Sequence, residues 1–190
     1  MAARTLPGRS LADCELIARS STTADAFHEL FDRHFMTVHR YLARRVGPDR
    51  ADDLASDTFT VAFTRRATFR TDATDARPWL LGIATNLLMN DRRAEQRSLE
   101  AVSRIRAQPV PPVAQLVDDG LDNEVAAALA ELDPDQRDAL LLFAWGELSY
   151  EEIAVALTIP VGTVRSRMSR ARSHLRRRLE PSARSEDDPK

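Results

Sequence analysis

The chain has 190 residues, of which 43% are hydrophobic and 29% are charged, and a formal net charge of −2. This composition favours a globular protein of one large or two small domains and excludes an intrinsically disordered chain. No apolar run approaches the roughly 18 residues that span a bilayer, the N-terminus lacks the apolar segment of a secretion signal, and the single cysteine, Cys14, cannot form an internal disulfide. We therefore expect a cytoplasmic protein without direct membrane insertion.

The first half of the chain predicts three helices. Residues 24–46 carry apolar side chains at three- and four-residue steps, the pattern of a helix with one buried face, and Gly47-Pro48 ends that helix. A second helix follows over 49–66. A polar loop then leads to Pro78, which suits the first turn of a third helix because the N–H that proline lacks is unpaired there.

Residues 94–122 predict a linker between two domains. They contain Pro109, Pro111 and Pro112, an acidic pair and a glycine, a composition that favours an extended connection over a packed element. The predicted organisation is an N-terminal segment 1–23, a helical domain 24–93, the linker 94–122, a second helical domain 123–180 and a polar tail 181–190. The expected fold class is all-α, with two small helical domains joined by a flexible linker.

The second domain contains two clear helix-start signals. Asp133 stands directly before Pro134, and Ser149 stands three residues before Glu152; both are N-cap patterns. A short break then separates a helix of about nine residues from a longer one over 161–179. Two helices of these lengths around a turn of three or four residues are typical of a helix-turn-helix.

The last helix has two faces of different chemistry. At 100° per residue, one stripe is apolar and must pack on the preceding helices; it consists of Val164, Met168, Ala171, Leu175 and Leu179. The opposite side and its flanks alternate small serines with arginines that can reach phosphates and base edges. Residues 160–179 contain seven arginines and no acid, whereas the preceding part of the domain is mostly acidic. This contrast predicts that the last helix faces a polyanion, and we infer nucleic acid.

Three stretches resemble one known family. "LSYEEIAVALTIPVGTVRSRMSRARSHLRRRL" resembles the domain that reads the promoter −35 element in the extracytoplasmic-function (ECF) sigma factors of bacterial RNA polymerase. "ADDLASDTFTVAF" is similar to the segment by which sigma factors bind the polymerase clamp, and "RPWLLGIATNLLMNDRR" is similar to their −10-element helix. The matches occur in the expected order and cover residues 24–179.

The resemblance implies three sets of functional residues. Those at or near the polymerase interface are Asp52, Asp53, Leu54, Asp57 and Phe59. The residues that engage the −10 element are Arg70, Asn86, Asn90, Arg92 and Arg93. The loop from Phe69 to Arg77 would act with them and hold an unstacked base. Those that meet the −35 duplex are Thr163, Arg165, Ser166, Arg167 and Arg170.

Two positions depart from the family pattern. Thr158 stands where the family usually has glycine in the turn between the helices, so a positive φ there would strain the backbone. Ser56 replaces a common glutamine in the polymerase-binding segment, which puts that single contact in doubt.

Other site chemistry is not favoured by the sequence. Asp52 and Asp53 are adjacent helix positions that diverge by 100°, and the steps between His28, His34 and His39 place them on different helix faces. No phosphate loop, nucleophile elbow or acid–base pair is present. We therefore expect no enzyme activity, catalytic residue, metal, cofactor or small-molecule substrate.

The expected function is that of a sigma factor, with core RNA polymerase and promoter DNA as partners, and an anti-sigma factor as a further partner that the resemblance implies. Its domains would recognise the −35 and −10 elements and help to open the DNA. The alternative is a stand-alone helix-turn-helix regulator that binds an operator without loading polymerase. A third possibility is an adaptor that uses both helical domains for protein contacts.

Overall fold

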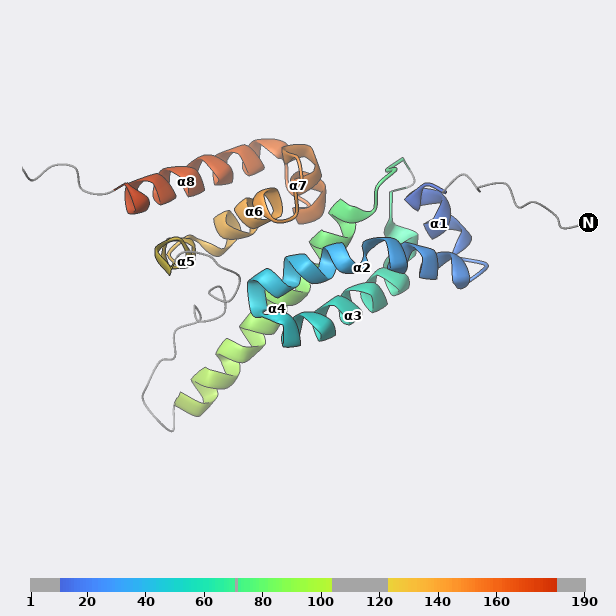
Figure 1. Cartoon of the computed structure of the whole chain (residues 1–190), viewed down its shortest axis with the longest axis horizontal. Helices are drawn as coiled ribbons and strands as arrows, with labels where there is room; N and C mark the ends of the chain where they lie inside the picture. Colours follow the sequence, from blue (N-terminus) through green and yellow to red (C-terminus); the bar gives the residue numbers. More distant parts are fainter. Residues whose placement is uncertain (1–10, 71, 104–122, 181–190) are drawn as a thin grey trace, which may run out of the picture.

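The computed structural model describes residues 11–70, 72–103 and 123–180. Within these ranges the chain forms eight α-helices and one short 3-10 helix, with no β-strand (Figure 1). The predicted all-α class is therefore confirmed. No helix in the described ranges combines the length and apolar character that crossing a membrane requires.

The first domain contains α1 (Asp13–Arg19), α2 (Asp25–Val46), α3 (Pro48–Arg65), the 3-10 helix η1 (Arg66–Thr68) and α4 (Arg77–Ser103). α2 and α3 lie antiparallel, and a single residue, Gly47, connects them (Figure 1). Gly47 has φ 81°, its N–H donates to the Ala43 carbonyl, and its own carbonyl accepts from the Ala51 N–H. One glycine therefore ends one helix and begins the next, because a side chain is unfavourable at this positive φ.

The second domain contains α5 (Asn123–Ala130), α6 (Pro134–Ala144), α7 (Tyr150–Leu157) and α8 (Val161–Leu179). The predicted caps are confirmed. The Asp133 carboxylate accepts from the Asp135 N–H at 3.0 Å. At the start of α7, the Glu152 N–H donates to Ser149 Oγ at 3.2 Å while the Ser149 N–H donates to Glu152 Oε2 at 2.8 Å. These reciprocal bonds pair N–H groups that have no partner within the helix.

Two parts of the chain differ from the sequence prediction. The N-terminal segment contains the helix α1, whose Leu16 and Ile17 are buried against the first domain. α4 continues to Ser103, so the first ten residues of the expected linker 94–122 are helical; good helix formers such as Ala94 and Arg97 favour this continuation. Residues 104–122, which include the three prolines, lie outside the described residues, so the flexible linker stays a prediction.

The two domains pack against each other along α4 and α7 (Figure 1). Gly82 on α4 faces the backbone of Ala156 on α7, and a Cβ at Gly82 would lie 2.3 Å from the Ala156 carbonyl oxygen. Buried apolar side chains of both domains form one continuous cluster. In this structure the two predicted helical domains therefore share a core.

A buried ion pair crosses the contact between the domains. Arg45, at the end of α2, is fully buried, and its guanidinium pairs with the Asp138 carboxylate on α6. It also donates to the Tyr41 hydroxyl at 2.6 Å, and that hydroxyl is bonded to Thr85 Oγ1 at 2.8 Å. Burial lowers the pKa of Arg45, but Tyr41 and Asp138 outweigh it, so the net shift is upward and the guanidinium stays charged. We call this group of four residues the interdomain seam.

Thr158 adopts the strained conformation that the sequence raised as a possibility, with φ 55° and ψ 46° at the end of α7. Because left-handed backbone costs an ordinary residue roughly 1–2 kcal/mol, we expect Thr158→Gly to raise the free energy of unfolding by about 1 kcal/mol. Urea denaturation measures this. Val155→Gly on the same helix, at an exposed position within its helical span, should instead lower stability by about 1 kcal/mol; equal effects of the two would contradict the strain argument.

Candidate nucleic-acid interface

The second domain holds α8 as the outer helix of a helix-turn-helix. α7 has eight residues, a three-residue break follows, and α8 has 19 residues. Val164, Met168 and Ala171 are buried against the domain, which confirms the predicted packing stripe over the first three turns. Leu175 and Leu179 are only half-buried.

The opposite face of α8 carries the residues predicted for the −35 element. Arg165, Ser166 and Arg170 are exposed, whereas Thr163 and Arg167 are half-buried. The structure therefore brings these five residues to one end of one helix, next to the turn. A row of guanidinium groups on an exposed helix face is able to contact phosphates and base edges in a DNA groove.

Acidic residues of the same domain hold some of these arginines. Arg167 pairs with Asp135 at the start of α6, and Arg165 lies 3.9 Å from Glu151 at the start of α7. These exposed pairs are individually weak, so DNA phosphates can replace the carboxylates at small cost. The acidic residues upstream of the turn thus orient the arginine side chains.

Arg172 is a residue whose role the sequence did not suggest. Its guanidinium lies 5.3 Å from the centroid of the Phe143 ring and 5.9 Å from that of Tyr150. The two rings, from α6 and α7, are themselves in edge contact at 5.8 Å. Arg172 therefore ties α8 to the two preceding helices through cation–π contacts. In the sequence, two aromatic residues ahead of a basic helix could have indicated such a contact. Their spacing, however, does not show which arginine of α8 faces the two rings.

The first domain presents a polar surface on α4. Asn86, Asn90 and Arg93 are exposed, as predicted for a surface that meets the −10 element. Arg70, in the loop before α4, is also exposed, and its guanidinium makes two bonds to the Asp72 carboxylate, of 2.6 and 3.1 Å. These four side chains are therefore accessible to a ligand.

Arg92, the fifth residue predicted for the −10 element, is half-buried, whereas its neighbour Arg93 is exposed. Burial in the first place, and then the nearby charges of Arg45 and Arg137, lower the pKa of Arg92 to about 10. Arg92 therefore lies next to the interdomain seam. The physical reason is that consecutive residues of a helix point about 100° apart, so Arg92 and Arg93 face different neighbours.

The five residues predicted at or near the polymerase interface divide between the exposed and the buried face of α3. Asp52, Asp53 and Asp57 are exposed on α3, and Asp52 pairs with His39 at 3.0 Å. Leu54 and Phe59, at 9% and 4% exposure, lie in the core. From the inner face of α3, these two side chains support the exposed acidic face.

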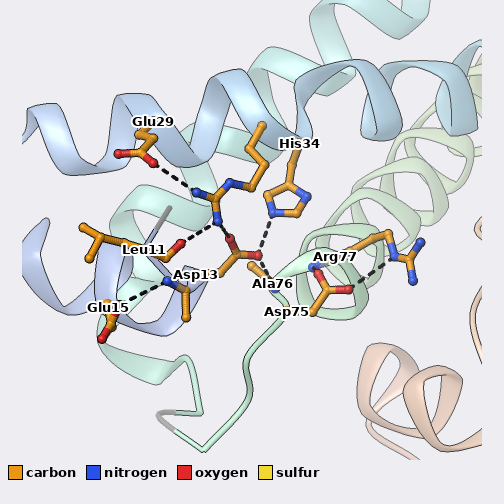
Figure 2. A network of polar contacts seen from close by, with 10 residues as sticks. Leu11, Asp13, Glu15, Glu29, His34, Asp75, Ala76 and Arg77 are labelled. Atoms are coloured by element: carbon orange, nitrogen blue, oxygen red, sulfur yellow. Dashed lines mark hydrogen bonds and ion pairs between the residues drawn. The ribbon is translucent and has the colours of Figure 1, made fainter. Parts of the chain in front are cut away.

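A polar network connects α1, α2 and the loop before α4 (Figure 2). The buried Asp13 carboxylate accepts from Arg33 at 2.5 Å, from the Ala76 N–H at 2.8 Å, and is bonded to His34 Nε2 at 2.7 Å. Burial raises the pKa of Asp13, but the bonds from His34, Ala76 and Arg33 together hold it below its ordinary value. Asp13 is therefore charged at neutral pH.

This network also places three potential metal ligands together. One ligand atom each of Asp13, His34 and Asp75 lies within 4.8 Å of the others. However, Asp13 is already bonded as above, the Asp75 carboxylate accepts from the Arg77 N–H at 2.7 Å, and the Arg33 guanidinium borders the group. These donors occupy the oxygens that a cation would need, so the arrangement fits an internal network better than a metal site.

Comparison with known proteins identifies the family. The family model for Sigma-70 region 2 matches residues 30–98, and that for Sigma-70 region 4 matches residues 122–175. The RNA polymerase sigma factor CarQ of Myxococcus xanthus is 34% identical over 159 residues, which cover 82% of this chain and 90% of CarQ. The chain belongs to the ECF sigma factors. As a sigma factor, it directs promoter-specific initiation of transcription. Sigma factors are transcription initiation factors.

Other similar proteins agree with this assignment. The ECF sigma factor EcfG of Rhodopseudomonas palustris is 35% identical over 67% of this chain and 70% of its own length. SigE of Mycolicibacterium smegmatis is 34% identical over 80% of this chain, but the chain spans only 60% of SigE. Among solved structures, the sigma factor RpoE of Bartonella quintana, in complex with the anti-sigma factor NepR, has a TM-score of 0.62 at 27% identity, covering 82% of this chain and 98% of that one.

Proposed function

We propose that this sigma factor binds core RNA polymerase through the acidic face of α3, reads the −35 element with α8, and engages the −10 element with α4 and the loop before it. The observation that supports this most strongly is the exposed arginine face of α8 behind a capped helix and turn, opposite a buried apolar stripe. A packed helix of this kind lies in the DNA major groove in helix-turn-helix proteins.

The −10 element would be engaged by Arg70, Asn86, Asn90 and Arg93, which are exposed on the first domain. Opening the duplex requires a surface that compensates for lost stacking and pairing, at a cost of a few kcal/mol per extruded base. The exposed polar side chains would supply hydrogen bonds, and the Phe69–Trp79 ring pair, whose centroids are 5.2 Å apart, would give the loop between them an apolar support. Arg92 would join them only after the domains separate and expose its guanidinium.

The two domains would separate when the promoter is bound. The −35 and −10 elements lie about 25 base pairs apart, or about 85 Å along B-DNA. In this structure α7 contacts both α4 and α8, so α4 and α8 belong to one closely packed body with a single helix between them. The closed arrangement is too short to span both elements. The interdomain seam and the Gly82–Ala156 contact are therefore the interactions that promoter binding must break.

The further partner would be an anti-sigma factor, since the similar RpoE and CnrH structures are complexes, with the anti-sigma factor NepR and with the cytosolic domain of CnrY respectively. We place the protein in the cytoplasm because bacterial polymerase and promoters are there. It would need no cofactor, metal or small-molecule substrate, and it would catalyse no reaction itself.

Run-off transcription with core RNA polymerase, with and without the chain, tests the proposal. We expect specific transcripts only when the chain is present, and weak promoter binding by the chain alone. A stand-alone regulator would bind an operator tightly without polymerase, and a protein adaptor would show no steep salt dependence with DNA. Equal transcripts in both reactions would refute the proposed function.

Arg170→Ala should weaken −35 recognition without affecting the fold. Arg170 is exposed and its side chain points away from the packing stripe, so loss of a base or phosphate contact should cost about tenfold in promoter affinity. Filter binding of the holoenzyme to promoters with and without the −35 element measures this. Arg176→Ala, nearer the end of α8 and paired with Glu180 at 3.8 Å, is the matched control. Equal losses for both variants would contradict the assignment of Arg170.

A further inference from the structure

The Asp13 network fixes the start of α4, although α1 lies far from it in sequence. Asp13 accepts from the backbone N–H of Ala76, 63 residues further along the chain. Ala76 is fully buried, and its carbonyl accepts from the Leu80 N–H at 2.9 Å. The same residue is thus bonded on one side to α1 and on the other side to the first turn of α4.

The carboxylate of Asp13 is oriented from three directions. Arg33 bonds one oxygen, and it is itself held by the Leu11 carbonyl at 2.9 Å and by Glu29 at 3.0 Å. His34 and Ala76 share the other oxygen (Figure 2). Three donors from α2 and the loop give the carboxylate one defined orientation. A residue that served only to pack α1 would not need a buried charge, because an apolar side chain would do so at lower desolvation cost.

The loop that Asp13 holds is the one that carries Arg70 and ends at α4. Asp75, directly before Ala76, accepts from the Arg77 N–H. The carboxylates of Asp13 and Asp75 each accept from a backbone N–H at the start of α4, and these two bonds fix the backbone there. The backbone at which the loop ends and α4 begins is therefore held by one carboxylate from α1 and one from the loop itself.

We propose that Asp13 is a positioning residue for promoter opening: it holds the loop before α4 in the conformation that engages the −10 element. The inference rests on the proposed function of that loop. Asp13 does not contact DNA, because it is buried; it acts through Ala76. Its loss should therefore impair strand opening while leaving polymerase binding and −35 recognition intact.

The test compares Asp13→Asn with wild type in holoenzymes reconstituted from the full chain and core polymerase. The templates are a duplex promoter that wild type transcribes and the same promoter with a premelted −10 region. We expect Asp13→Asn to lose about tenfold or more in run-off transcript and in permanganate reactivity on the duplex, but to stay within about twofold of wild type on the premelted template. Its core affinity should also stay within about twofold. This split between templates would not arise from a merely structural defect.

Glu15→Gln is the matched control, since Glu15 lies on the same helix and caps only its own Ala12 N–H at 3.1 Å. It should behave as wild type on both templates. If Asp13→Asn does not fold, the apolar pair Asp13→Leu with Arg33→Met keeps α1 packed without the bond to Ala76 and should show the same split between templates.

Three outcomes would overturn the inference. Wild-type activity of Asp13→Asn on the duplex would show that the bond from Asp13 to Ala76 is dispensable. Where Asp13→Asn does not fold, wild-type activity of the apolar pair would show the same. Equal losses on both templates together with weaker core binding would show a structural role alone. If wild type itself gave no specific transcript on any duplex, the proposed function would fail and this inference with it, a result that the wild-type reaction distinguishes from the first two.

Discussion

Asp138→Ala is expected to open the closed arrangement of the two domains. The change removes the carboxylate that pairs with Arg45, a residue with 0% exposure. An unpaired charge held in that position would cost about 3–5 kcal/mol. Because Asp138 lies on the second domain and Arg45 on the first, the protein can avoid this cost by separating the domains and hydrating the guanidinium. Small-angle X-ray scattering should show a larger radius of gyration than for wild type.

Two controls separate this effect from a general loss of charge. Asp135→Ala removes an acid from the same helix, but Asp135 pairs with Arg167 of its own domain, so this variant should stay closed. The apolar pair Arg45→Met with Asp138→Leu removes both charges and should also stay closed. Unchanged scattering and unchanged stability for Asp138→Ala would contradict the role of the seam.

Gly82→Ala offers a second route to the open form without a buried charge. Its new methyl group would lie 2.3 Å from the Ala156 carbonyl oxygen, a backbone atom that cannot rotate away. Overpacking of this kind costs about 1–3 kcal/mol, and here it acts across the contact between domains. If Asp138→Ala unfolds instead of opening, Gly82→Ala still tests whether the domains separate.

Opening the seam should also affect function. If the closed form must open before promoter binding, its stability lowers the apparent affinity of the holoenzyme for DNA by the fraction of molecules that are open. We expect the open variants to bind promoter on the order of tenfold more tightly, since each 1.4 kcal/mol corresponds to a factor of ten.

The sequence predicted what depends on neighbours along the chain. Helices with an apolar stripe, the caps at Asp133 and Ser149, and the exposed face of α8 follow from spacing and local bonds, and the structure has them. Thr158 belongs to the same group, because a turn of fixed length determines its backbone. Periodicity and local capping patterns together therefore predicted most of the helices and the arginine face of the candidate site.

The sequence did not predict what depends on distant partners. Arg45 is one of two adjacent arginines at the end of a helix, and its burial depends on Asp138, 93 residues away. Arg92 is half-buried beside the same seam, and Asp13 is buried because residues 20 to 63 positions later surround it. A charged residue is buried only where partners from other parts of the chain surround it. A helical wheel shows the residues of one helix and none of these partners.

Val164→Asp is expected to unfold the helix-turn-helix. Val164 is fully buried at the start of the stripe that includes Met168 and Ala171. A carboxylate there either remains charged without a partner or takes up a proton, and each possibility costs free energy. Losses above about 4 kcal/mol are typical of an unpaired charge in a core, and a domain of this size has little more to lose. Circular dichroism during thermal unfolding should show reduced helix content and an early transition.

Ser166→Asp is the matched control for that prediction, because it places the same charge on the same helix at an exposed position. It should keep wild-type helicity while weakening DNA binding through repulsion of the phosphates. The two variants thus lose −35 binding for different reasons, and only Val164→Asp should lose it together with the helix. A wild-type melting curve for Val164→Asp would show that α8 does not pack by this stripe, and the arginine face would then lose the fixed orientation on which DNA recognition depends.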